Sequence, residues 1–549
     1  MIIPEDDPVN LANQLLQTLL ESTPNTQNFR GKWSLIGAKV AHLKTQLADL
    51  SDFPSFPTNA LSLELLRSLT QTLYEAISLC KTCQTKNLPS GKLKTQNDVD
   101  SVSARLDSHV SDAEVLIKSG VLQDGVVSGS KRELVRVEAR NLVTRLQIGT
   151  AESRNTALDS VLSLLQEDDK NVLIAVAQGV VPVLVRLLDS SSSPEIKEKT
   201  VTAIARVSTV DSSKHVLVAE GLLLLNNLLR VLESGSGFAK EKACVSLLAL
   251  SQSKENARAI GSRGGISALL EICQAGTPSS QAVAAGVLRN LAAFPEIKEN
   301  FIEESAVSTL LSLAASGTTS AQENSIGCLS NLVLDDVQLK LLIAREGGIE
   351  SLKSFWDSAP TARSLEAAVD LLKQLSSCPP IAEVIVSDGF INRLVSVLNC
   401  AVLGARIAAA RAVYELGFNT KTRKELGECG SIPPLVRMME GKAAEEKEAA
   451  AKALSALLVY AGNRRIFRKE EKGIVSAVQL LDPLVQNLDK KYPVAVLALL
   501  VHSKTCRKQM IAAGAYLHLQ KLAEIEVEGA KKVLESLGRG KLWGVFARP

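Results

Sequence analysis

The sequence predicts an all-α protein in which a small N-terminal helical bundle precedes one elongated array of helical repeats. First, 46% of the 549 residues are hydrophobic but only 3% are aromatic, and cores of Leu, Ala, Val and Ile favour closely packed helices over sheets. Second, one residue pattern recurs about every 42 positions from residue 179 onward. Third, the first 125 residues lack this period but alternate helical patterns with loops that contain Pro or Gly.

Residues 1–125 are expected to form a bundle of four-helix type. Amphipathic patterns cover residues 11–20, 33–50, 61–82 and 98–118. The breaks between them carry helix-ending residues: Pro24, two prolines in 51–57, and Pro89 with Gly91. Lys and Asp are interspersed in these helices, which favours packing against one another over binding to a membrane or a partner helix.

Residues 126–549 are expected to form the array, with about nine to ten repeats. Position five after each repeat start is Leu in eight copies and Ala477 in the other, and position eight is apolar in all. These positions form an i, i+3 pair on one helical face, so we expect them to be buried. The repeat starts are Gly179, Glu220, Gly264, Ser305, Gly347, Gly389, Gly430, Lys472 and Gly514.

Each copy continues through a polar loop into an alanine-rich helix, as in residues 282–292 and 405–416. Alanine allows neighbouring helices to approach closely, which accounts for the scarcity of aromatic residues. A single unit of this kind cannot bury its own apolar faces, so several must stack into a solenoid.

The repeated segments resemble the armadillo repeat. Residues 179–188 and 430–439 share a G-x-x-P-x-L-V-R pattern, and residues 287–291 and 328–332 share a later L-x-N-L. The HEAT repeat has the same period but not this motif. The resemblance implies a right-handed α-solenoid in which the last helix of each repeat lines a concave groove that holds a partner segment.

Residues 141–171 resemble the start of the array in plant proteins of the vacuolar-protein-8-like type, which are related to U-box ubiquitin ligases. That likeness implies a scaffold that binds partner proteins. The interval between Gly120 and Arg132 is too short for a U-box and lacks its Cys-Pro-Ile motif, so no ligase activity is expected. An adaptor role in ubiquitin transfer or kinase signalling stays open as an alternative.

The armadillo likeness also marks candidate partner-binding residues. At the position where such arrays carry an Asn that binds a peptide backbone, this chain retains Asn only twice. Nuclear import adaptors of this fold have a Trp four residues earlier; Gly286 and Gly327 stand there, which disfavours that alternative. For each candidate, a solvated groove wall or a hydrogen bond to the neighbouring repeat is the competing role. The candidates are Arg206, Asn290, Asn331, Gln374, Arg411 and Glu415.

A basic patch is the second candidate surface. The chain carries 62 Lys and Arg against 59 Asp and Glu, a balance that argues against nucleic-acid binding. From residue 401 onward, however, 25 basic residues face 15 acidic ones. We expect the patch to bind an acidic protein or anionic lipid. Its members are Arg464, Arg465, Arg468, Lys469, Arg507 and Lys508.

No catalytic motif, cofactor or metal site is expected. None of the five histidines has metal-ligand spacing, and the Cys80-x-x-Cys83 pair lacks a second pair or a nearby His. The carboxylates in 445–448 stand at the start of a predicted helix, where acids favour the helix dipole. The most apolar stretch, 172–188, is too short and too interrupted to span a membrane. We therefore expect a soluble, non-enzymatic protein of the cytoplasm or nucleus.

Overall fold

The computed structural model describes residues 7–545 apart from 87, 124–129, 190–191, 360 and 362–363, and the side chains up to residue 538. Within these residues every regular element is a helix. The chain forms two compact units, residues 1–250 and 251–549, and each is described separately. The predicted boundary between residues 125 and 126 lies outside the described residues.

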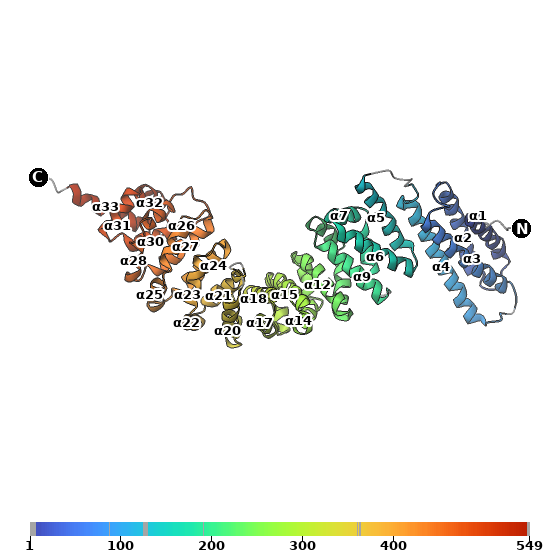
Figure 1. Ribbon diagram of the computed structural model, residues 1–549, viewed down its shortest axis with the longest axis horizontal. Coiled ribbons are helices and arrows are strands. Elements are labelled where there is room, and N and C mark those ends of the chain that lie inside the picture. Colours follow the sequence, from blue (N-terminus) through green and yellow to red (C-terminus); the bar gives the residue numbers. More distant parts are fainter. Residues whose placement is uncertain are drawn as a thin grey trace. The chain divides into compact units, whose positions relative to one another are not determined.

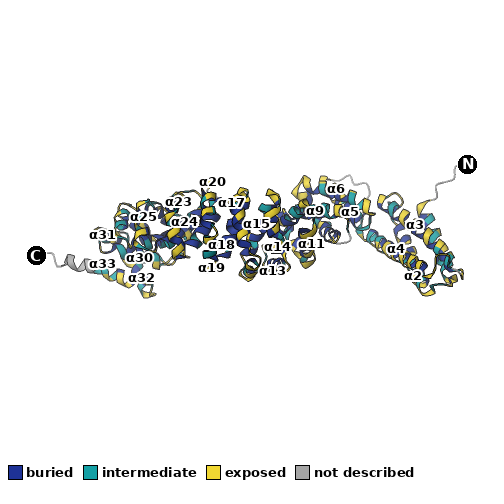
Figure 2. Cartoon of the chain, turned by 90° about the horizontal axis from the view of Figure 1, so that it is seen from below, coloured by how far each residue is buried: buried dark blue, intermediate teal, exposed yellow. Residues whose placement is uncertain are grey.

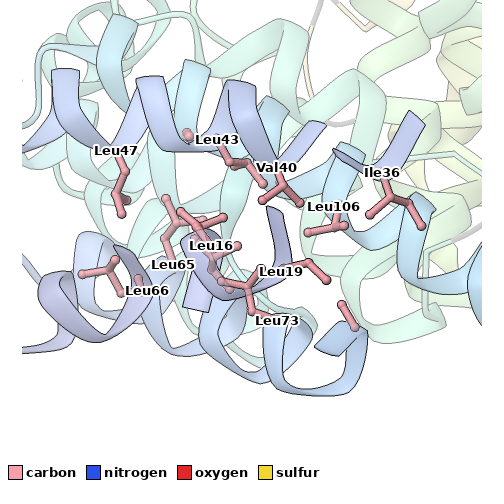
Figure 3. Packing of buried hydrophobic residues seen from close by; sticks show 14 of the residues in the cluster. Leu16, Leu19, Ile36, Val40, Leu43, Leu47, Leu65, Leu66, Leu73 and Leu106 are labelled. Carbon is pink, nitrogen blue, oxygen red and sulfur yellow. The ribbon is translucent and has the colours of Figure 1, made fainter. Parts of the chain in front are cut away.

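Four helices open the first unit, as the sequence predicts (Figure 1). Their apolar faces enclose one core that contains Leu16, Val40, Leu66 and Leu106, whose side chains point toward one another (Figure 3). Asn59 caps α3 by accepting hydrogen bonds from the backbone N–H groups of Leu61 and Ser62. The helices are α1 (Pro8–Ser22), α2 (Arg30–Ser51), α3 (Ala60–Cys83) and α4 (Lys92–Ser119), with the short 3-10 helix η1 (Thr23–Asn25).

The first unit continues with eight described α-helices and one 3-10 helix, which begin the array. The helix α4 packs on α5 (Lys131–Ile148). At the start of α6 (Ala151–Glu167), the carboxylate of Glu64 in the bundle accepts hydrogen bonds from the side chains of Thr150 and Ser153 at 3.3 and 3.1 Å. The remaining helices are α7 (Asp169–Ala177), α8 (Val180–Leu187), α9 (Pro194–Ser208), η2 (Asp211–Ser213), α10 (Lys214–Ala219), α11 (Gly221–Ser234) and α12 (Gly237–Leu250).

The second unit repeats a set of three helices: a short first helix, a second helix, and a third helix that is usually the longest. The repeats begin with α13 (Lys254–Gly261), α14 (Gly265–Ala275), α15 (Pro278–Ala292), η3 (Pro295–Ile297), α16 (Lys298–Glu303), α17 (Ala306–Ser316), α18 (Thr319–Leu332), α19 (Val337–Arg345), α20 (Gly348–Ser358) and α21 (Leu365–Ser376). They continue with α22 (Pro379–Ser387), α23 (Phe390–Leu398), α24 (Leu403–Leu416), α25 (Thr420–Glu428), α26 (Ile432–Met439), α27 (Ala444–Leu457), α28 (Ala461–Phe467), α29 (Gly473–Gln479), α30 (Lys491–Leu500), α31 (Lys504–Ala512), α32 (Ala515–Glu524) and α33 (Ala530–Val545).

The predicted core stripe is confirmed. Every residue at positions five and eight of the nine copies is buried, from Leu184 and Leu187 to Leu519 and Leu522. Figure 2 shows buried and exposed residues on the same helices, as a stacked array requires. Six repeat-start glycines have a backbone φ between 75° and 90°, a left-handed conformation that glycine adopts without steric cost. This residue lets the chain turn between the first and second helices.

Candidate partner-binding surfaces

The third helices of the second unit pack side by side in the order α15, α18, α21, α24, α27, α30 and α33. One side of each helix enters the core, and the other leaves polar residues half-buried or exposed. We call the candidates on these helices the polar row. Its members are Asn290, Asn331, Gln374, Arg411 and Glu415.

Two members of the polar row bond the neighbouring repeat. The amide nitrogen of Asn331 donates to the backbone oxygen of Arg289, in the third helix of the preceding repeat, at 3.1 Å. The amide nitrogen of Asn290 donates to the hydroxyl of Ser251 at 3.0 Å. These contacts are the competing role that the sequence leaves open, so the two asparagines join successive repeats.

The other three members present their side chains to solvent. Arg411 is exposed, and Gln374 and Glu415 are half-buried. Their side chains make no hydrogen bond or ion pair with any residue that the structure describes. They can therefore bond a partner without breaking an existing contact.

Arg206 lies in the first unit and is held by its own chain. Its Nε donates to the backbone oxygen of Leu165 at 3.0 Å, and one terminal nitrogen lies 2.6 Å from the carboxylate of Asp169. Its side chain is only 25% exposed. The guanidinium thus links the ends of α6 and α9 to the start of α7, and its charge is already paired.

An aromatic and cationic cluster on the third helices was not predicted. The ammonium of Lys452 in α27 lies 4.3 Å from the ring centre of Tyr414 in α24 and 5.7 Å from that of Tyr492 in α30. Such spacing is typical of cation–π contacts. The one available signal is that two of only five tyrosines fall on third helices. We call these three residues the tyrosine–lysine cluster.

The residues of the basic patch lie on α28, directly after its end at Phe467, and on α31. Arg464 and Arg507 are half-buried, and each donates to a carbonyl at the end of the preceding third helix: Leu458 at 2.9 Å and Val501 at 3.2 Å. Arg423 makes the same contact with Gly417 at 2.8 Å. These arginines therefore satisfy helix C-termini. Arg465, Arg468, Lys469 and Lys508 are exposed.

Arg464 and Arg468 also border a groove of about 510 Å³. The groove lies among α28, the end of α30 and α33. Lys532 is the third cation on it, and His502 is a further polar neighbour. Of the six residues of the predicted patch, only Arg464 and Arg468 line the groove; Arg465, Lys469, Arg507 and Lys508 lie outside it.

Burial shifts the pKa values of several titratable groups in the bundle. Burial raises the pKa of the Cys80 thiol to about 11, and it lowers the pKa of His109 to about 4, with the positive charge of Arg105 acting in the same direction. Burial raises the pKa of Asp112 to about 6, although Arg154 opposes the shift. Among the described residues, no group of three or more His, Cys, Asp or Glu is arranged to hold a metal ion.

No single helix in the described ranges is long and apolar enough to cross a bilayer. Two consecutive pairs reach that length only together, α7 with α8 and the segment 211–219 with α11, and each pair is sharply bent, by 84° and 99°.

Comparison with known proteins agrees with this architecture. Residues 10–121 match a domain of unknown function, DUF7032, and residues 168–209 match the armadillo/beta-catenin-like repeat. An engineered protein solved by the Northeast Structural Genomics Consortium superposes with a TM-score of 0.62 at 22% identity, covering 73% of this chain and 99% of the other. The chain therefore has an all-helical fold in which a DUF7032 region precedes armadillo repeats.

The curated relatives are plant proteins. U-box domain-containing protein 10 of Arabidopsis thaliana is 33% identical over 82 residues, which cover 15% of this chain and 13% of the relative. Putative U-box domain-containing protein 47 of the same species is 25% identical over 177 residues, which cover 31% and 40%. The chain thus spans less than half the length of these relatives. It is an armadillo-repeat protein distantly related to plant U-box armadillo proteins.

Proposed function

We propose that the protein is a non-enzymatic scaffold or adaptor that holds segments of partner proteins on the third helices of its second unit. The observation that carries this proposal is the combination of the tyrosine–lysine cluster with Arg411, whose charge has no partner among the described residues. Tyr side chains offer large contact areas at low entropic cost, and Arg offers several donors, so both are frequent at protein interfaces.

The distribution of the polar row favours binding over catalysis. Its members stand on successive helices, which pack roughly 8–10 Å apart. Catalysis needs a base, a nucleophile and charge-stabilising groups within hydrogen-bond reach of one point. Side chains spread along an array are better suited to an extended segment, whose backbone and side chains they can contact in turn.

The test is affinity purification from plant tissue with the full chain. We expect R411E/K452E to lose partners that the wild type retains, while the control R345E/K421E, which reverses two exposed charges elsewhere in the same unit, retains them. Both variants should keep the wild-type melting temperature within a few degrees. Identical partner lists for the wild type and R411E/K452E would refute the proposal.

An adaptor role in ubiquitin transfer or kinase signalling is the second candidate, favoured by the similarity to U-box domain-containing proteins. Enrichment of ubiquitin-conjugating enzymes or receptor kinases among the captured proteins would support it. We further propose that the protein resembles vacuolar-protein-8-like proteins and lacks a U-box. We also propose that it acts in the cytoplasm or nucleus.

A nuclear import role has less support. The Arg289 side chain packs so closely on Gly327 that a Cβ atom there would come within 2.5 Å of its Nε. The backbone of α18 is therefore covered at the position where import adaptors carry a Trp.

A further inference from the structure

The groove beside α28 combines an apolar floor with a cationic rim. Ala498 and Leu499 near the end of α30 and Val533 in α33 line it, together with Arg464, Arg468 and Lys532. No Asp or Glu lines it among the residues whose side chains are described. It is thus a concave surface that offers both hydrophobic contact and positive charge.

Among the described residues, no carboxylate pairs with the rim cations Arg464, Arg468 and Lys532. Arg464 donates to the carbonyl oxygens of Leu458 and Val459, both at 2.9 Å. The Nε of Arg468 donates to the backbone oxygen of Arg464 at 2.9 Å. Carbonyl groups orient a guanidinium without cancelling its charge. By contrast, Arg393 and Arg406 are paired with Asp357 and Glu446.

The surrounding sequence strengthens the local charge. From residue 461 to residue 512, ten Lys or Arg stand against four Asp or Glu, which leaves a net charge of +6. A ligand that enters the groove therefore meets a positive field.

We propose that this groove is a second docking site, which binds an acidic segment of a partner protein with apolar side chains between its carboxylates. The apolar side chains cover Leu499 and Val533, while the carboxylates pair with Arg468 and Lys532. A peptide segment fits a concave surface of about 510 Å³ better than a membrane does, because a flat bilayer would meet only the rim. The site is separate from the tyrosine–lysine cluster.

The experiment measures fluorescence anisotropy of the full chain with a labelled peptide of about ten residues in which Glu and Leu alternate. Two matched probes replace Glu by Lys or Leu by Ser. The test variant is R468E/K532E, and the control is again R345E/K421E. Vesicles of phosphatidylcholine with and without phosphatidylserine form a parallel arm. Melting temperatures check that all variants are folded.

We expect the Glu–Leu peptide to bind, R468E/K532E to weaken binding at least tenfold, and the control variant to bind as the wild type does. The Lys and Ser probes should bind at least tenfold more weakly. Equal binding of the Glu and Lys probes, equal binding of the Leu and Ser probes, or an unchanged affinity of R468E/K532E would overturn the proposal. So would binding of phosphatidylserine vesicles without binding of the peptide. Because R411E/K452E leaves this groove intact, failure here is distinguishable from failure of the scaffold proposal.

Discussion

Replacing Glu446 by Ala should destabilise the junction between two repeats of the second unit. The carboxylate of Glu446, at the start of α27, lies 2.7 Å from a terminal nitrogen and 2.9 Å from the Nε of Arg406 in α24. The Glu446 side chain is only 6% exposed and that of Arg406 is 21% exposed. This ion pair therefore joins neighbouring third helices with little access to water.

The structure sets the expected magnitude. Removing one partner of a buried ion pair costs about 3–5 kcal/mol, because the other charge stays desolvated. Arg406 keeps one hydrogen bond, to the backbone oxygen of Cys400 at 2.9 Å, and some solvent exposure, so we expect E446A to lose about 3 kcal/mol. E446Q keeps an acceptor and should lose about 1–2 kcal/mol. R406L/E446L removes both charges and should regain at least about 1 kcal/mol relative to E446A.

The assay combines denaturant unfolding with hydrogen exchange, because repeat arrays can open locally. Exchange should accelerate most in α24 and α27. A double-mutant cycle of the wild type, R406L, E446L and R406L/E446L should show a coupling of about 2 kcal/mol. A loss below about 0.5 kcal/mol for E446A, or losses for R406L and E446L that add up to the loss of R406L/E446L, would show that the pair does not stabilise the junction.

Three further predictions concern the amide contacts and pH. N290A/N331A should lower the melting temperature, by about 1 kcal/mol of stability for each lost inter-repeat hydrogen bond; an unchanged melting temperature with weaker partner capture would assign both residues to binding instead. His109 titrates near 4 in the fold and near 6.5 when unfolded, so it should remove up to about 3 kcal/mol as pH falls between those values. Asp112, with its pKa raised to about 6, should add stability as pH falls from about 6 toward 4. Denaturant titrations should therefore show D112N losing stability on acidification more steeply than wild type, and H109Q less steeply; the reverse order would contradict the assigned environments.

The repeats were predictable because their signals are local. A glycine that adopts positive φ, such as Gly264 or Gly347, marks the turn in the chain itself, and an i, i+3 pair marks the buried face. The same pattern does not predict burial correctly at position two of every repeat. Leu222 and Tyr516 stand at the apolar position two of their repeats, yet they are 54% and 39% exposed.

The contacts between repeats could not be predicted, because they depend on the register in which helices stack. Glu446 has the sequence context of a solvated acid at a helix start, yet its partner lies 40 residues earlier. Lys452 lies 38 residues after Tyr414 and 40 before Tyr492, and only the packing of α24, α27 and α30 brings the rings to the ammonium. Likewise, the charges at Arg464 and Arg507 give no sign that each guanidinium completes the end of another helix.

The contact of Glu64 with the start of α6 gives the DUF7032 region a role at the end of the array. A solenoid of stacked repeats exposes an unfinished apolar face at its first repeat unless a terminal element covers it. Because α4 packs on α5 and Glu64 bonds the residues that open α6, the bundle closes that face with its own folded core. A fragment that begins at Lys131 would therefore expose the apolar residues of α5 that α4 covers in the full chain, and it should be more prone to aggregate than a fragment that keeps the bundle.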